Sequence, residues 1–213
     1  MKIIKLMLIF FIFSFISLES YSQQKIIGGG VNTRNKSETM QLGWLGISAK
    51  GTYSLPSGDI SNVLNGSLGA ELTVVYRNFI LNDFDIQLSS SYQNYTNKAD
   101  SSNQFQTINV KLLGRYNFFV PDVPGCIYVE AGGGVSFETL TASSVKLDNI
   151  DPIYHFGVGY EIGIFENFTL QTGINYLLMP QKYIVDAIRD GSFINFSIGI
   201  NYEFLEEKGG KRK

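Results

Sequence analysis

Apolar side chains recur at every second position in eight successive stretches between residues 42 and 204. Residues two apart lie on the same face of a β-strand, so each stretch predicts a strand with one apolar and one polar face. Leu72 and Val74, for example, lie at the alternate positions of one stretch that are apolar, which we call its apolar parity. Thr73 lies at the intervening positions, its polar parity. Eight such segments in 213 residues predict an all-β fold in a single domain.

The connections between these segments alternate in length. The long ones cover residues 56–66, 96–104, 139–152 and 180–192, and the short ones residues 78–83, 119–125 and 166–167. This alternation predicts an antiparallel up-and-down sheet with all loops at one end and all turns at the other.

The N-terminus has the three parts of a secretory signal peptide. Lys2 and Lys5 precede an apolar run over residues 6–18, and a more polar stretch ends with small residues that place a cleavage between Ser22 and Gln23. The alternative is an N-terminal anchor helix, which the short run does not favour because a helical span needs about 20 apolar residues. We therefore expect export to the cell envelope.

Four segments follow from these patterns. Residues 1–22 are the signal peptide, 23–41 a flexible glycine-containing segment, 42–204 the β-barrel and 205–213 a charged tail.

The chain without its signal peptide holds 15 basic and 18 acidic residues, so it lacks the charge excess of a nucleic-acid-binding protein. We expect a monomer.

The parity alone does not tell which face of a closed sheet points inward. A soluble lipocalin-like barrel places its apolar parity inside around a ligand, whereas a membrane barrel places it outside. The segments reach about 10 residues, the length of a tilted strand across a bilayer. The polar parity is rich in small residues that fit a narrow interior, namely Gly132, Gly134, Gly157, Gly159, Gly163, Gly173 and Gly199. Both features favour an eight-stranded transmembrane barrel.

Aromatic residues on the apolar parity gather near the strand ends. At the loop end they are Tyr53, Tyr92, Phe137, Tyr154 and Tyr176, and at the turn end Tyr76, Phe84, Tyr116, Phe118, Phe168, Tyr202 and Phe204. Two such bands are typical of the aromatic girdles at the two surfaces of a bilayer.

Charged residues on the polar parity form the candidate site. The expected lumen network consists of Arg115, Glu130, Glu161, Lys111, Lys50 and Glu71. A hairpin folded about residues 121–124 places Arg115 opposite Glu130, and we expect these two to form a hydrogen-bonded pair with Lys111 and Glu161 nearby. A charge in a narrow lumen needs a partner, so the network predicts a salt-bridged plug; the alternative is a selectivity filter.

Catalytic and metal-binding patterns are not recognisable in the sequence. His155 is the only histidine and Cys126 the only cysteine, which leaves no zinc pattern of the usual kind. We interpret His155 as a packing and hydrogen-bonding residue of the lumen and Cys126 as a small residue at a strand start. No cofactor or metal is expected, and we predict that the protein is not an enzyme.

Over residues 42–204 the pattern resembles the small outer-membrane barrels of the OmpA/OmpX-like class, loosely called the porin family. The last strand, with Ser197, Gly199, Tyr202 and Phe204, is similar to the signal read by the barrel-assembly machinery, although residues 205–213 follow it. The resemblance implies an outer-membrane location, contact with lipid, and insertion by that machinery. It implies a structural or interaction role, with four loops offered to an unknown extracellular partner. The alternatives are a narrow porin-like channel and, less favoured, a soluble lipocalin-like binder.

Overall fold

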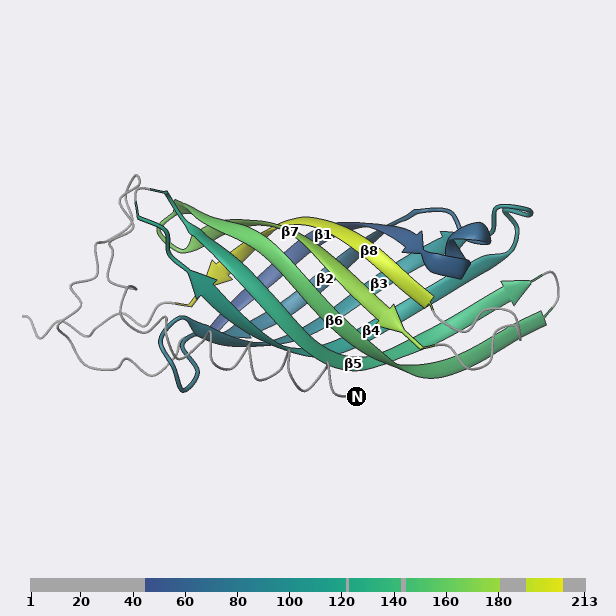
Figure 1. Cartoon of the computed structure of the whole chain (residues 1–213), viewed down its shortest axis with the longest axis horizontal. Helices are drawn as coiled ribbons and strands as arrows, with labels where there is room; N and C mark the ends of the chain where they lie inside the picture. The colour runs from purple at the N-terminus through teal and green to yellow at the C-terminus, as the bar shows by residue number, and fades with distance from the viewer. Residues whose placement is uncertain (1–44, 122, 143–144, 181–190, 205–213) are drawn as a thin grey trace, which may run out of the picture.

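The computed structural model describes residues 45–121, 123–142, 145–180 and 191–204. They form a closed barrel in which each strand lies beside its neighbours in sequence (Figure 1). The strands are β1 (Leu45–Ser57), β2 (Ser67–Tyr76), β3 (Phe84–Thr96), β4 (Gln104–Phe118), β5 (Cys126–Ala142), β6 (Val145–Phe165), β7 (Phe168–Met179) and β8 (Gly191–Glu203). A short 3-10 helix, η1 (Gly58–Asn62), follows β1.

Every pair of neighbouring strands is antiparallel, and β1 pairs with β8 from Gly46 opposite Glu203 to Ser57 opposite Ser192. This last pairing closes the sheet and confirms the predicted eight-stranded up-and-down barrel. The predicted signal peptide with its Ser22–Gln23 cleavage, the segment 23–41 and the tail 205–213 lie outside the described residues. The described part of the chain holds no helix of the length and hydropathy that a membrane span requires.

The connections follow the predicted alternation with one exception. The predicted loop over residues 139–152 is wrong, because β5 and β6 continue as a paired hairpin in which Thr139 faces Asp148 and Leu140 faces Leu147. Polar residues there suggested a loop, but Thr, Leu and Ile suit a strand and the neighbouring strand satisfies their backbone groups. The predicted loop over 180–192 lies almost wholly outside the described residues.

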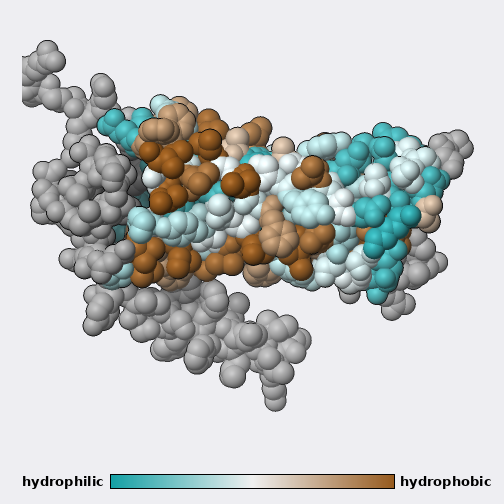
Figure 2. Space-filling model, turned by 90° about the horizontal axis from the view of Figure 1, so that it is seen from above, coloured by the Kyte–Doolittle hydropathy of each residue, from teal (hydrophilic) through white to brown (hydrophobic). Residues whose placement is uncertain are grey.

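The two faces of the sheet carry the residues that the parity predicts. Leu72 and Ile198 point outward and remain 62% and 59% exposed, whereas Lys111 and Glu161 point inward and are buried. On the face shown in Figure 2, hydrophobic residues gather over the middle of the barrel and toward the turn end, whereas the loop end is mostly hydrophilic. We call this hydrophilic outer surface the polar collar. A row of paired outward residues, Asn94, Gln106, Thr139 and Asp148, crosses it from β3 to β6.

The strands differ in how far they extend at the loop end. Strand β6 pairs with β7 only from Tyr154 onward, and within the described residues its first part, from Val145 to Ile153, pairs with β5 alone. The β5–β6 hairpin therefore extends beyond the closed part of the barrel.

Strands β4 and β5 approach each other closely at two glycines. A Cβ atom added to Gly134 would meet the carbonyl oxygen of Val110, and one added to Gly132 would meet that of Leu112, in both cases nearer than real Cβ atoms come. The absence of a side chain is thus a packing requirement at both positions.

Gly134→Ala should destabilise the barrel by about 1–3 kcal/mol, because the added methyl group would push β4 away from β5. Gly51→Ala is the matched control, since its Cβ would lie 3.9 Å from the nearest atom, the oxygen of Ile198. Urea unfolding of the two variants in the same detergent gives the free energies. Equal stabilities would show that the close approach is not needed.

Candidate functional site in the barrel lumen

Five charged side chains meet inside the barrel near the turn end and form what we call the arginine cluster: Arg77, Asp85, Arg115, Glu161 and Glu203. Arg77 donates from Nη1 to Asp85 Oδ2 at 2.9 Å, and its Nη2 lies 2.5 Å from Glu161 Oε1 and 3.1 Å from Glu203 Oε1. Arg115 donates from Nη2 to the other oxygen of Glu161. Glu161 thus bridges two guanidinium groups, an arrangement that pairs charges which would be costly to bury alone.

Arg115 is the most enclosed member of this cluster, with a fully buried side chain. Its Nε donates to Asn117 Oδ1 at 2.8 Å, and its guanidinium lies 3.8 Å from the centre of the Tyr128 ring, within cation–π distance. The Tyr128 side chain fills the space left by Gly159 and Gly173, where a Cβ atom would collide with the phenol. The inward glycines therefore make room for the aromatic ring that packs on Arg115.

A second cluster, the lysine cluster, lies nearer the middle of the barrel. Glu71 Oε1 accepts from Lys50 Nζ at 3.1 Å and Glu71 Oε2 accepts from Lys111 Nζ at 2.6 Å, with all three side chains buried. A separate buried pair joins His155 Nε2 to Glu130 Oε1 at 2.9 Å. The lysine cluster thus links β1 and β2 to β4 across the lumen, and the His155–Glu130 pair links the neighbouring strands β5 and β6.

The structure corrects the predicted pairing within this network. Arg115 does face Glu130 in the register of β4 and β5, as expected. The predicted direct hydrogen bond is nevertheless wrong, because Arg115 binds Glu161 and Asn117 while Glu130 binds His155. Long side chains in a narrow lumen can reach across it, so the residue opposite in register need not be the partner. Likewise Lys111, expected near Glu161, binds Glu71.

A further part of the lumen filling was not predicted. At the loop end the inward parity becomes apolar, and a buried cluster, which we call the apolar seal, comprises Ile60, Leu64, Tyr95, Phe105, Ile153, Leu177, Met179 and Phe193. The Tyr95 ring centroid lies 4.9 Å from that of Phe193 and 6.0 Å from that of Phe105. The signal was in the sequence, since five strands (β3, β4, β6, β7 and β8) place apolar side chains on the inward parity near their loop ends.

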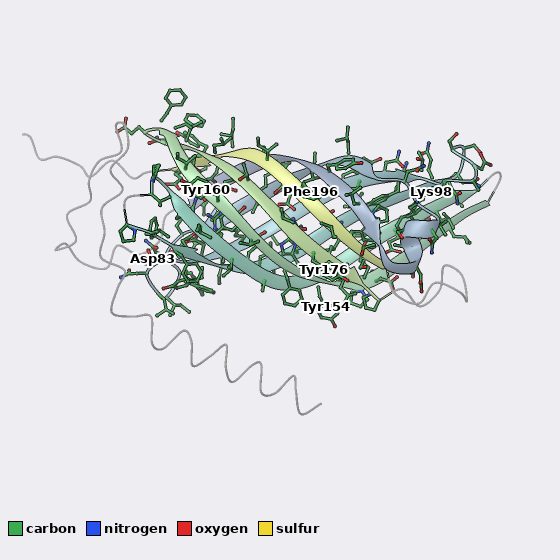
Figure 3. All side chains as sticks on the ribbon, turned by 45° about the horizontal axis from the view of Figure 1, so that its top comes forward. Asp83, Lys98, Tyr154, Tyr160, Tyr176 and Phe196 are labelled. Carbon is green, nitrogen blue, oxygen red and sulfur yellow. The ribbon has the colours of Figure 1, made fainter. Side chains whose placement is uncertain are left out.

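Helix η1 and the residues after it cover this seal. Ile60 and Leu64 are only 3% and 6% exposed and point into the cluster. The segment is held by the β3–β4 loop, where Lys98 donates from Nζ to Ser61 O at 2.6 Å and from its backbone N to Val63 O at 2.8 Å. Figure 3 shows Lys98 at this end of the barrel and Asp83 at the other. The lumen is therefore filled at two levels, by charges toward the turn end and by apolar side chains at the loop end.

The predicted girdle residues lie on the outer face. Tyr154 and Tyr176 project from the neighbouring strands β6 and β7 (Figure 3) and are about half exposed, as are Tyr53, Tyr92 and Phe137. At the turn end the rings contact one another, and the pairs Tyr116–Phe118, Phe168–Tyr202 and Tyr202–Phe204 have centroids 4.8–5.0 Å apart. Tyr76 pairs instead with Phe79, a ring that the prediction missed. Phe84, the remaining predicted residue of this band, faces Tyr116 across β3 and β4.

The residues of the predicted assembly signal all lie in or just after β8. Ser197 and Gly199 have the inward parity, where a Cβ on Gly199 would collide with Lys50, whereas the rings of Tyr202 and Phe204 pack edge to face on the outside. No group of three or more His, Cys, Asp or Glu side chains within the described ranges is placed to hold a metal ion.

No protein-family model matches the sequence, and no curated protein matches it. Solved structures do match the fold. Neisserial surface protein A has a TM-score of 0.61 at 16% identity, with 75% of this chain and 97% of that chain covered. The chain has the fold of the small outer-membrane β-barrels. The attachment invasion locus protein Ail of Yersinia pestis matches this chain with a TM-score of 0.53 at 15% identity, and the match covers 77% of this chain and 100% of Ail. OprG of Pseudomonas aeruginosa gives 0.50 at 14% identity, with coverages of 76% and 96%.

Glu161→Gln should destabilise the barrel by roughly 3–5 kcal/mol, because it removes the charge that two buried guanidinium groups share. Asp148→Asn, which breaks the exposed pair between Lys146 Nζ and Asp148 Oδ1 at 3.7 Å, should cost less than about 1 kcal/mol. Unfolding of both variants in urea tests the difference. A small loss of unfolding free energy for Glu161→Gln would mean that water, and not Glu161, compensates the charges of Arg77 and Arg115.

Proposed function

We propose that this protein is a non-conducting integral barrel of the outer membrane, with a structural or interaction role carried by its loop end. One observation supports this most strongly, namely the filling of the lumen at two separate levels. A solute would have to displace both the bridged arginines and the packed rings of Tyr95 and Phe193. The interior of an eight-stranded barrel is only wide enough for side chains, which agrees with this role.

The outer face supports the membrane location. Large apolar side chains such as Leu72, Leu112 and Phe156 are 57–62% exposed around the barrel, which is a poor surface for water but a suitable one for lipid. The matching solved structures are outer-membrane proteins, and the expected signal peptide would direct the chain to that compartment.

Leu72→Arg should lower the stability of the lipid-inserted barrel by about 2–4 kcal/mol, because a cation would lie among the acyl chains. Gln106→Arg on the polar collar is the control and should change the stability by less than about 1 kcal/mol, since that side chain is expected in water. Reversible unfolding from phospholipid vesicles measures both. An equal loss of stability in both variants would contradict the placement of Leu72 in lipid and of the polar collar in water.

The polar collar and its loops are the surface that an external partner would meet, and we propose that they face outward from the cell. Ail was solved with the heparin analogue sucrose octasulfate. The described loop end of this chain offers no basic surface for such an anion, since Asp59, Asp100 and Asp148 accompany Lys98 and Lys146. Hydrogen bonds from the side chain and backbone of Ser102 lower the pKa of Asp100, so its negative charge is retained even below the usual aspartate range. A polysulfated glycan is therefore not the partner we propose.

Two further features complete the proposed role. The ordered β8, with its inward Gly199 and its outward Tyr202 and Phe204, is the strand we propose for recognition by the barrel-assembly machinery. The lumen carboxylates that could act in catalysis are held by other lumen side chains, Glu130 by His155 and Glu161 by two arginines, so we propose a non-enzymatic barrel.

The purified protein should show no steady conductance in planar lipid bilayers. Arg115→Ala, which opens the charged level, and Phe193→Ala, which loosens the apolar seal, should each remain closed because the other level still fills the lumen. The double variant should leak, whereas Asp148→Asn should behave like the unmodified protein. A large, stable conductance of the unmodified protein would overturn the plug and favour a narrow channel.

A further inference from the structure

The connection between β2 and β3 presents an isoleucine in an unusual backbone conformation. Ile80 has φ = 63°, in the left-handed region that β-branched residues rarely adopt, and its side chain is 75% exposed. The next residue, Leu81, is 58% exposed. A turn in water normally uses Gly, Asn or Asp at such positions, as this turn itself does at Asn78 and Asp83. Ile80 is thus both exposed and held in a strained conformation, a combination that clusters at functional positions.

The surrounding hydrogen bonds hold this turn in place. Asn78 Oδ1 accepts from the backbone N of Asp83 at 3.0 Å, and the backbone N of Asn78 donates to Asp85 Oδ1 at 3.1 Å. Asp85 is in turn fixed by Arg77 of the arginine cluster. The buried charges thus fix the conformation that displays Ile80 and Leu81.

The neighbouring connection adds to the same surface. Between β4 and β5, Val120 and Val123 are 42% and 44% exposed. The two connections are adjacent, since the backbone N of Asn117, at the end of β4, donates to Asp83 O at 2.9 Å. We name the four apolar side chains Ile80, Leu81, Val120 and Val123 the anchor surface.

The other end of the barrel has the opposite character. The loop between β3 and β4 exposes Lys98, Asp100, Ser101 and Ser102, and the outer face there is hydrophilic (Figure 2). Toward the turn end, hydrophobic residues gather on the face of the barrel shown in Figure 2, and the ring centroid of Phe79 in the β2–β3 turn lies 5.9 Å from that of the outward Tyr76. Phe79 thus links the apolar outer face to the turn that carries Ile80 and Leu81.

We propose that the anchor surface inserts into the interfacial layer of the lipid leaflet at the turn end and sets the depth of the barrel in the membrane. The proposal rests on the proposed membrane location and adds to it a lipid-binding role for two connections outside the sheet. Apolar side chains at the boundary of headgroups and acyl chains are the usual anchors of proteins at that depth. The strands are longer than a bilayer span requires. With the anchor surface at the turn end, their extra residues lie on the loop side, where the polar collar is in water.

Tryptophan substitutions in the full chain test the depth. Trp44, the only native tryptophan, is replaced by Phe, and a single new one is introduced as Ile80→Trp or Val123→Trp on the anchor surface, Leu72→Trp on the outer face, or Ser101→Trp in the loop. Each variant is folded into two preparations of phosphatidylcholine vesicles, one with bromine on the acyl chains just below the headgroups and one with bromine deep in the chains, and folding is checked by resistance to unfolding in detergent gels.

Fluorescence at both anchor positions should be quenched by the lipid brominated just below the headgroups at least about threefold more than that of Ser101→Trp, and should be protected from aqueous iodide. Quenching of Leu72→Trp in either preparation without quenching of Ile80→Trp and Val123→Trp would overturn the anchor while leaving the membrane location intact. Absence of quenching of Leu72→Trp in both preparations would overturn the membrane location, and the anchor with it. The second anchor variant keeps the test decisive if Ile80→Trp does not fold.

Discussion

The pairing of β1 with β8 is the interaction on which the rest of the structure depends. Because the first and last strands bond along 12 residue pairs, from Gly46 to Ser57, the sheet has no edge in its closed part and its backbone groups are satisfied within the sheet. Closure also separates the side chains into one set that must share a narrow interior and another that surrounds the barrel. The charged clusters, the apolar seal and the apolar outer face are consequences of that separation.

The closed sheet and its two faces were predictable from the sequence, because an alternation of period two can be recognised within each strand without knowing its partner strands. Leu72 and Thr73 fall on opposite faces whichever strand lies beside them. The hairpin of β4 and β5 was also predictable, since the turn at residues 119–125 fixes which residues face each other, and Arg115 does lie opposite Glu130. Glycine on the inward parity likewise indicated a crowded interior, which Tyr128 above Gly159 and Gly173 bears out.

The lumen contacts were not predictable in the same way, because they join strands that are far apart in sequence. Arg115 binds Glu161, which is 46 residues away in the sequence, and not Glu130, which lies directly opposite it in the sheet. Such choices depend on side-chain length, on the stagger of the strands and on competing partners such as His155. The apolar seal was missed for a different reason. Tyr95 and Phe105, which flank the loop expected over residues 96–104, were not part of the predicted lumen network. Ile60 and Leu64 lie in a predicted loop and become part of the interior only because η1 folds over the opening.

Within the described residues, the first part of β6 extends beyond β7, which bears on how the barrel meets another sheet. A strand with an open side can recruit a strand from a neighbouring molecule, and exposed edges are a common start of aggregation. Here the extension carries Lys146 and Asp148, whose charges resist burial against another sheet, and Pro152, which has no N–H to offer to a foreign strand. The same hairpin that extends beyond the closed barrel thus carries, on its own strands, side chains that disfavour pairing with another sheet.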